Sequence, residues 1–205
     1  MNKLLVGALF FLLGNSQAGA NTVDERDPVT IITEASNQIL EVLNRRRSEF
    51  TEHPELLTHV VRENMLPLID VEYSARLVLG RAGRGISGEQ LSAFSKALSN
   101  ILITRYSDSL LEFSSDELMQ VMPMKGKNTD KLTRVRTRIK LSRGGFIPVD
   151  FAFHKTDKGW KTFDVTVEGI SYVITFRNQI SPRVLAEGID KVTADIIAGN
   201  VKFDE

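Results

Sequence analysis

The stretch that decides the fold is WKTFDVTVEGISYVITFRNQI, which runs from Trp160 to Ile180. Its first half alternates apolar and polar residues, the pattern of a strand with one buried face. Phe163, Val165 and Val167 fall on one side of this strand and Asp164 falls on the other. Glu168-Gly169 then leads into a second segment that also keeps an apolar face. Two consecutive elements with one apolar side each indicate an apolar cavity rather than a polar catalytic cleft.

Further strands are predicted before this stretch. Residues 131–142 alternate strictly, with Val135 and Ile139 on one face and basic residues on the other. Gly144-Gly145 is a hairpin signal, and residues 147–155 alternate again with Phe151 facing inward. A shorter strand is expected near residues 118–122. The C-terminal half is therefore predicted to be an antiparallel meander with one apolar face.

The N-terminal half has the periodicity of helices. Asp27-Pro28 is a helix start, because an N-cap residue is followed by proline at the first helical position. Pro54 opens a second helix, and Ser87 with Gln90 forms a capping box for a long helix that reaches about residue 113. A last helix is expected from about Pro182 to residue 197. Helices followed by a one-sided sheet predict an α+β fold, in which the helices cover the apolar face and enclose a pocket.

The first twenty residues have the features of a secretory signal peptide. Lys3 precedes an apolar run of about ten residues, and Ala18-Gly19-Ala20 has the form of a signal-peptidase site, so cleavage is expected before Asn21. A buried N-terminal helix is the alternative. Residues 21–205 are then expected to form a single domain, soluble because no later apolar run is long enough to span a membrane.

The composition limits the cellular compartments and the classes of ligand that are expected for this protein. The chain has no cysteine, which excludes a disulfide framework and a lipid-anchoring cysteine, and export then indicates the periplasm or the external medium. Lys+Arg and Asp+Glu are balanced at 26 each, which argues against non-specific binding of nucleic acid.

No catalytic or metal-binding constellation can be assembled from the sequence. His53, His59 and His154 stand in no metal-binding frame, so no metal site is expected. Asp164 and His154 are the candidate bases of an enzyme of this size, but alternation places both on the polar face of the sheet. A glycine-rich patch around Arg81 and Arg84 does not follow a strand, which favours a helix connection over a phosphate-binding loop.

Four like charges line the polar face of one predicted strand. Such a row is unfavourable unless acidic residues lie across from it, and Asp150 and Asp164 are available for that. The row is either a solvated, cross-paired sheet face or a docking surface for an acidic partner or anionic headgroups. Its members are Arg134, Arg136, Arg138 and Lys140.

Several short motifs occur in order along the chain: Met65-Leu66-Pro67, Tyr73 with Ala75, Leu77-Val78-Leu79-Gly80, Phe163-Asp164-Val165 and Val167-Glu168-Gly169-Ile170-Ser171. These motifs resemble the MlaC family, also known as toluene-tolerance protein Ttg2D. The similarity extends in order from Asp27-Pro28 to residues 188–190, and its most specific part is the Glu-Gly-Ile-Ser motif after the aspartate-containing strand. One departure is Arg81-Ala82-Gly83, where the family often has a bulky or aromatic pair.

The resemblance implies a periplasmic phospholipid-binding protein of the Mla ABC transport system. It implies an NTF2-like curved sheet wrapped by helices around an apolar pocket, and a helix that starts near Ser171. The cargo would be phospholipid, with no other cofactor. The partners would be an outer-membrane MlaA–porin complex and an inner-membrane ABC complex containing MlaD. The alternatives are an NTF2-like isomerase or hydratase and a non-catalytic interaction protein.

A carrier has to shelter the acyl chains of its cargo. Hiding about 30 methylene groups at ~0.8 kcal/mol each is a gross demand of roughly 24 kcal/mol. The apolar faces of the long helix, the sheet and the segment after it are the candidate pocket walls, although packed core and wall cannot be told apart at this level. The candidates are Leu98, Ile101, Leu102, Val135, Ile139, Phe151, Phe163, Val165, Val167, Ile170, Val173 and Ile174.

Overall fold

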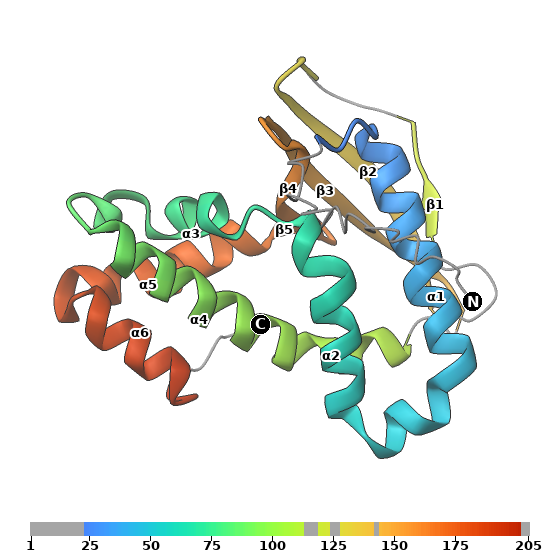
Figure 1. Ribbon diagram of the computed structural model, residues 1–205, viewed down its shortest axis with the longest axis horizontal. Coiled ribbons are helices and arrows are strands. Elements are labelled where there is room, and N and C mark those ends of the chain that lie inside the picture. Colours follow the sequence, from blue (N-terminus) through green and yellow to red (C-terminus); the bar gives the residue numbers. More distant parts are fainter. Residues whose placement is uncertain (1–22, 113–118, 124–127, 142–143, 202–205) are drawn as a thin grey trace, which may run out of the picture.

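A computed structural model describes residues 23–112, 119–123, 128–141 and 144–201 of the protein (Figure 1). The expected signal peptide, residues 1–20, lies outside the described residues. The α-helices are α1 (Pro28–Glu52), α2 (Pro54–Met65), α3 (Val71–Leu79), α4 (Gly88–Tyr106), α5 (Tyr172–Glu187) and α6 (Ile189–Ile197). The 3-10 helices are η1 (Leu66–Leu68), η2 (Gly80–Gly83) and η3 (Ser107–Glu112). The strands are β1 (Met119–Val121), β2 (Leu132–Lys140), β3 (Phe146–Thr156), β4 (Gly159–Val167) and β5 (Ile170–Ser171).

The strands form one antiparallel sheet in the order β1-β2-β3-β4-β5. Val135 of β2 pairs with Phe151 of β3, which in turn pairs with Val165 of β4. Because directly opposed residues share a face, these three side chains form a row across one face of the sheet. The α+β class and the antiparallel meander predicted from the sequence are confirmed.

Helix α1 covers this apolar face (Figure 1). It begins where the sequence predicts, because the Asp27 carboxylate accepts hydrogen bonds from the N–H groups of Val29 and Thr30, and Pro28 occupies the first turn. Ile31 and Ile32 are buried against the sheet. The apolar face of the sheet is thus closed by the first helix of the chain.

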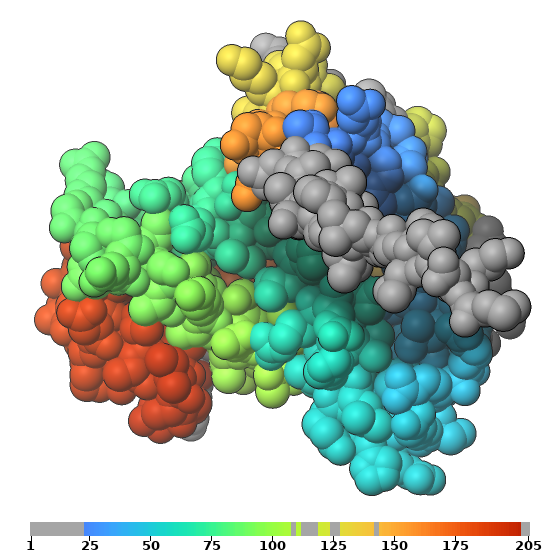
Figure 2. Space-filling view, in the orientation of Figure 1, coloured from blue at the N-terminus to red at the C-terminus, as the bar shows by residue number. Residues whose placement is uncertain are grey.

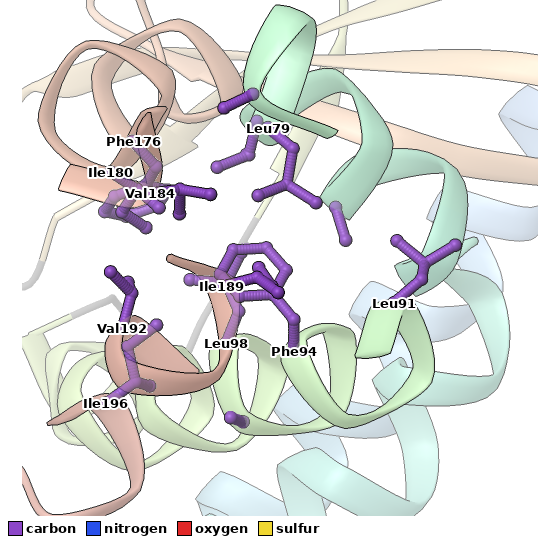
Figure 3. Close-up of a cluster of buried hydrophobic side chains, with 14 of the residues drawn as sticks. Leu79, Leu91, Phe94, Leu98, Phe176, Ile180, Val184, Ile189, Val192 and Ile196 are labelled. Atoms are coloured by element: carbon purple, nitrogen blue, oxygen red, sulfur yellow. The ribbon is translucent and has the colours of Figure 1, made fainter. Parts of the chain in front are cut away.

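Helices α3 to α6, together with η2, form a helical lobe with a core of its own (Figure 3). Leu79, Phe94, Ile180 and Val192 come from four different helices of this lobe, and all four are fully buried. Burying an aliphatic or aromatic side chain of this size stabilises the fold by about 1.5–3 kcal/mol. The lobe meets the sheet where α3 and α5 contact β4.

The helices of the C-terminal segment differ from the sequence prediction at one point. A helix beginning near Pro182 was expected, but Pro182 lies inside α5, which begins at Tyr172. The chain then breaks at Gly188, whose φ of 85° few other residues adopt, and α6 follows. The helix start near Ser171 that the family resemblance implies is confirmed.

None of the helices in the described ranges is both long enough and apolar enough to cross a lipid bilayer.

Candidate functional site

In the part of the chain that the structure describes, the buried apolar side chains form four clusters. One lies inside the helical lobe, one between α1 and α2, and two between α1 and the sheet. Half-buried apolar side chains pack at the edges of these clusters, whereas small domains usually bury one contiguous core. We call the following set the apolar cleft: Leu40 of α1, Leu56, Val60 and Met65 of α2, Ile101, Leu102 and Tyr106 of α4, and Met119, Phe151, Val165 and Val167 of the sheet.

Figure 2 shows a hollow on the face of the molecule where α2, α3 and α4 meet. A side chain in a packed core excludes water almost completely, whereas an apolar side chain beside a hollow stays partly accessible. The intermediate exposure of the apolar cleft residues agrees with the second situation. Elements from both ends of the chain contribute to this set, so it exists only in the folded protein.

The structure places the twelve predicted pocket residues in different environments. Five belong to the apolar cleft, namely Ile101, Leu102, Phe151, Val165 and Val167. Four others lie inside the packed clusters behind it, with 9% or less of their surface exposed: Leu98, Val135, Ile139 and Val173. Sequence periodicity identifies both groups as apolar faces and does not separate them.

Phe163 does not share a face with Val165 and Val167, so the predicted alternation is wrong at this position. The pairing of β3 with β4 shifts between Ala152 and Phe153, which leaves Phe163 as an extra residue on β4. A bulge of this kind reverses the direction of the side chains that follow it. The Phe163 ring packs at 5.3 Å edge-on against Tyr73 and at 5.5 Å against His154, on the face opposite to the buried Phe153.

The corner between β4 and α5 presents its apolar side chains to solvent. Ile170 and Ile174 are 64% and 55% exposed, and Ile170 pairs with Val167 and so shares its face of the sheet. The chain turns through Glu168 and Gly169, which have φ values of 50° and 87°. The predicted corner therefore exists, and its two isoleucines are exposed to solvent.

Asp164 holds this corner together. Its carboxylate accepts a hydrogen bond of 2.6 Å from the Ser171 hydroxyl and one of 3.0 Å from the Val173 N–H. The Ser171 hydroxyl in turn accepts from the N–H of Ile174 in the first turn of α5. Asp164 is on the outer face, as alternation predicts, and there it fixes the start of α5 to the sheet.

His154, the other candidate base, links the sheet to α3. Its Nε2 lies 3.0 Å from Asp70 Oδ2, and its ring stacks on Tyr73 at a centroid distance of 4.2 Å. The second oxygen of Asp70 caps α3 by accepting from the Tyr73 N–H. Asp164 and His154 thus both connect helices to the sheet and are separate from the half-buried apolar residues of the cleft.

The basic row lies on the outer face of β2. Arg134 and Arg136 share Asp150, at 3.8 Å and 3.9 Å, while Arg138 donates to Gln120 and lies over the Phe146 ring. Asp164, the other acidic residue expected across from the row, is occupied at the α5 corner. This geometry agrees with a cross-paired sheet face, and docking at Lys140 and its three arginine neighbours stays a prediction.

Sequence reasoning missed the contribution of the first two helices to the cleft. Leu40 lies beside the sheet cluster, and Val60 and Met65 lie beside the cluster between α1 and α2. Each belongs to an apolar helix face that also supplies packed core residues. The periodicity of that face therefore does not show which of its residues are only half-buried. Tyr106 is oriented by an edge-on contact of 5.5 Å with Tyr172, which comes from the distant α5.

Fold and site together define an α+β protein in which the helix-covered sheet and the helical lobe both carry half-buried apolar side chains. The family model described as MlaC protein matches residues 33–198, so the chain belongs to the MlaC family. The resemblance in the sequence motifs is thereby confirmed.

The chain is similar to two characterised relatives of this family. It is 24% identical over 167 residues to the intermembrane phospholipid transport system binding protein MlaC of Haemophilus influenzae, covering 80% of this chain and 77% of that protein. It is 24% identical over 183 residues to the toluene tolerance protein ttg2D of Pseudomonas putida, covering 88% and 84%.

The fold matches that of a phospholipid-binding protein from Ralstonia solanacearum, whose structure was solved in complex with a phospholipid. The TM-score is 0.72, and the match covers 83% of this chain and 99% of that one. The sequences are 18% identical, so this likeness establishes a common fold.

Proposed function

We propose that the protein is a periplasmic phospholipid carrier. It receives a phospholipid from one membrane, shelters the acyl chains in the apolar cleft and releases the lipid at the other membrane. The partners in this proposal are an outer-membrane MlaA–porin complex and an inner-membrane ABC complex containing MlaD, and the result is a maintained lipid asymmetry of the outer membrane. The observation that carries the proposal is the apolar cleft itself, supported by relatives named for phospholipid transport and binding.

The energetics of lipid transfer explain why such a cleft is needed. Moving the ~30 methylene groups of one phospholipid from a bilayer into water costs roughly 24 kcal/mol of free energy. A carrier lowers this barrier when apolar side chains replace the bilayer around the chains. The half-buried residues of α4 and the sheet can supply that surface without unfolding, because the packed clusters behind them hold the walls in place.

Within the cleft, opposite walls would contact the lipid. Ile101 and Leu102 form the wall from α4, and Phe151, Val165 and Val167 form the wall from the sheet. Leu98, Val135, Ile139 and Val173 support these walls from behind. The headgroup would stay at the mouth of the cleft in contact with water, since the cleft residues offer apolar atoms almost exclusively.

The proposal includes no catalytic step. Transfer would follow docking to a partner that stabilises an open form of the cleft, and lipid would move toward the site of higher affinity. The carrier would act as a monomer after removal of residues 1–20, with residues 21–205 as one lipid-binding domain. His154 and Asp164, the candidate bases of the enzyme alternative, have structural partners that account for their positions.

A vesicle assay tests the carrier function. Donor vesicles containing a fluorescent phospholipid and a quencher are mixed with unlabelled acceptor vesicles, and the recovery of fluorescence is followed. Since spontaneous transfer exposes the chains to water, the protein is expected to accelerate recovery by at least about tenfold, in proportion to its concentration. Heat-unfolded protein at the same concentration is the control. Equal rates with folded and unfolded protein would contradict a carrier role.

A further inference from the structure

A second hollow lies on the helical lobe, between α3–η2 on one side and α5 on the other. It has a volume of about 620 Å³, and its lining includes Arg76, Arg81 and Arg84 from the first side and Arg177 from the second. We call it the arginine groove. Its lining includes none of the apolar cleft residues, and it lies on different elements from the basic row of β2.

The arginines of the groove concentrate positive charge on one side of the helical lobe. Arg76, Arg81 and Arg84 are exposed, and within the described ranges no ion pair joins any of them to a carboxylate. Arg183, six residues beyond Arg177 on α5, contrasts with them because it pairs with Glu187 at 2.9 Å and with Asp195 at 2.8 Å. Like charges gathered in a concave site with low-dielectric walls focus a positive potential, which attracts an anionic ligand.

The walls of the groove are fixed by hydrogen bonds between its two sides. Arg177 donates from Nε to the carbonyl of Leu77 at 2.5 Å. The Ser181 hydroxyl donates to the carbonyl of Leu79 at 3.0 Å. A groove held in this way needs little rearrangement to bind, and preorganisation of this kind favours affinity.

The groove also has an apolar component. Leu77 and Pro182 contribute to the lining, and Leu185 at the rim is 69% exposed, among the most exposed large apolar side chains in the described part of the chain. A free phosphate ion would use the arginines and leave these groups in water. A flat anionic membrane surface would contact the exposed arginines but would not fill the hollow of about 620 Å³ between α3–η2 and α5. An acidic peptide segment with an occasional apolar side chain fits both components.

We propose that the arginine groove is a docking site for an acidic segment of a partner protein. The proposal rests on the proposed function, because a carrier has to dock to exchange its lipid. Guanidinium groups bind carboxylates through paired hydrogen bonds, and exposed charges of this kind accelerate association and give it a strong dependence on salt. The groove would then orient the carrier on its partner while the lipid stays in the separate apolar cleft.

The experiment is a nuclear magnetic resonance titration of the isotope-labelled protein. The probe is a short synthetic peptide of alternating glutamate and leucine, and a lysine–leucine peptide of equal length is the control. The glutamate peptide is expected to shift the amide signals of residues 76–84 and 177–185, and the affinity is expected to fall steeply between about 0.05 M and about 0.5 M salt. Shifts confined to other regions would overturn the proposal.

Charge reversal within and outside the groove makes the test specific. The double variant Arg81→Glu/Arg84→Glu is expected to lose affinity for the glutamate peptide by at least about tenfold and to gain affinity for the lysine peptide. The matched control is Arg45→Glu/Lys96→Glu, which changes the net charge by the same amount at exposed positions of α1 and α4 outside the groove and is expected to bind like the parent protein. An equal loss of affinity for the glutamate peptide in both variants would show that only the net charge matters and would overturn the proposal.

Two further arms distinguish the ligand, and one separates this proposal from the carrier function. Inorganic phosphate that displaces the peptide at low concentration, or phosphatidylglycerol vesicles that bind through the same arginines with equal strength, would overturn docking of a peptide. Co-purifying phospholipid is measured on the same samples. Both double variants are expected to retain it, and a parent protein that binds the peptide but carries no lipid would refute the carrier function alone.

Discussion

Replacing Val167 with arginine is expected to empty the protein of phospholipid. Val167 is half-buried on the inner face of β4, paired with the buried Val149 and grouped with Val165 at the edge of the sheet cluster. An arginine there would place a charged group where the acyl chains are proposed to lie, and a charge without a partner in an apolar site costs several kcal/mol. Lipid phosphorus extracted per mole of purified protein is expected to fall by at least about tenfold.

The neighbouring position supplies the matched control. Thr166 is half-buried like Val167 but faces the other side of the sheet, where it pairs with Asp150 and Ser171. Thr166→Arg is therefore expected to leave the lipid content unchanged. Leu102→Trp approaches the cleft from α4 with bulk instead of charge and is expected to reduce lipid content as well. The fold of the Val167→Arg variant is verified by circular dichroism. If the folded variant retains its full lipid content, Val167 does not line the cleft.

The second large effect is expected for Asp164→Ala, on stability. The substitution leaves the Ser171 hydroxyl and the Val173 N–H without their acceptor and removes the link between β4 and α5. Loss of two hydrogen bonds to a charged group costs about 2–4 kcal/mol of unfolding free energy. For a domain of this size each kcal/mol lowers Tm by about 2–4 °C, so a decrease of about 4–16 °C is expected in a thermal melt.

Two comparisons make this result diagnostic. Asp150→Ala removes a carboxylate from the same face of the sheet, but its ion pairs with Arg134 and Arg136 are long, so a change below about 1 kcal/mol is expected. Ser171→Ala and Asp164→Ala should be non-additive in a double-mutant cycle, because both interrupt the same chain of hydrogen bonds. Additive effects, or equal losses for Asp164→Ala and Asp150→Ala, would contradict the structural role of Asp164.

Features that depend on neighbouring residues could be predicted from the sequence. The caps at Asp27 and Ser87 involve groups within three residues of each other, so the residue types alone identify them. Alternation correctly placed Val135 and Ile139 on the buried face. The relation between α5 and the sheet was implied only by the family motif, because the residues after Tyr172 favour strand and helix about equally.

Features that depend on distant contacts could not be predicted in this way. The bulge that turns Phe163 toward Tyr73 and His154 arises from the pairing of β3 with β4 and leaves no mark in the alternation. Cleft wall and packed core come from the same helical stripe, as Leu98 and Leu102 illustrate, and only the surrounding elements decide which residue stays half-buried. The arginine groove likewise needs Arg177 beside Arg76, which lies about a hundred residues earlier.

Native mass spectrometry of the purified protein, exported with its own N-terminal segment and isolated without detergent, tests the central claim most directly. Collision-induced release would identify the bound molecule by its mass. The carrier account predicts a protein of the mass of residues 21–205 with phospholipid bound in most of the molecules. A homogeneous protein free of lipid, which also fails to take up phospholipid from added vesicles, would contradict it.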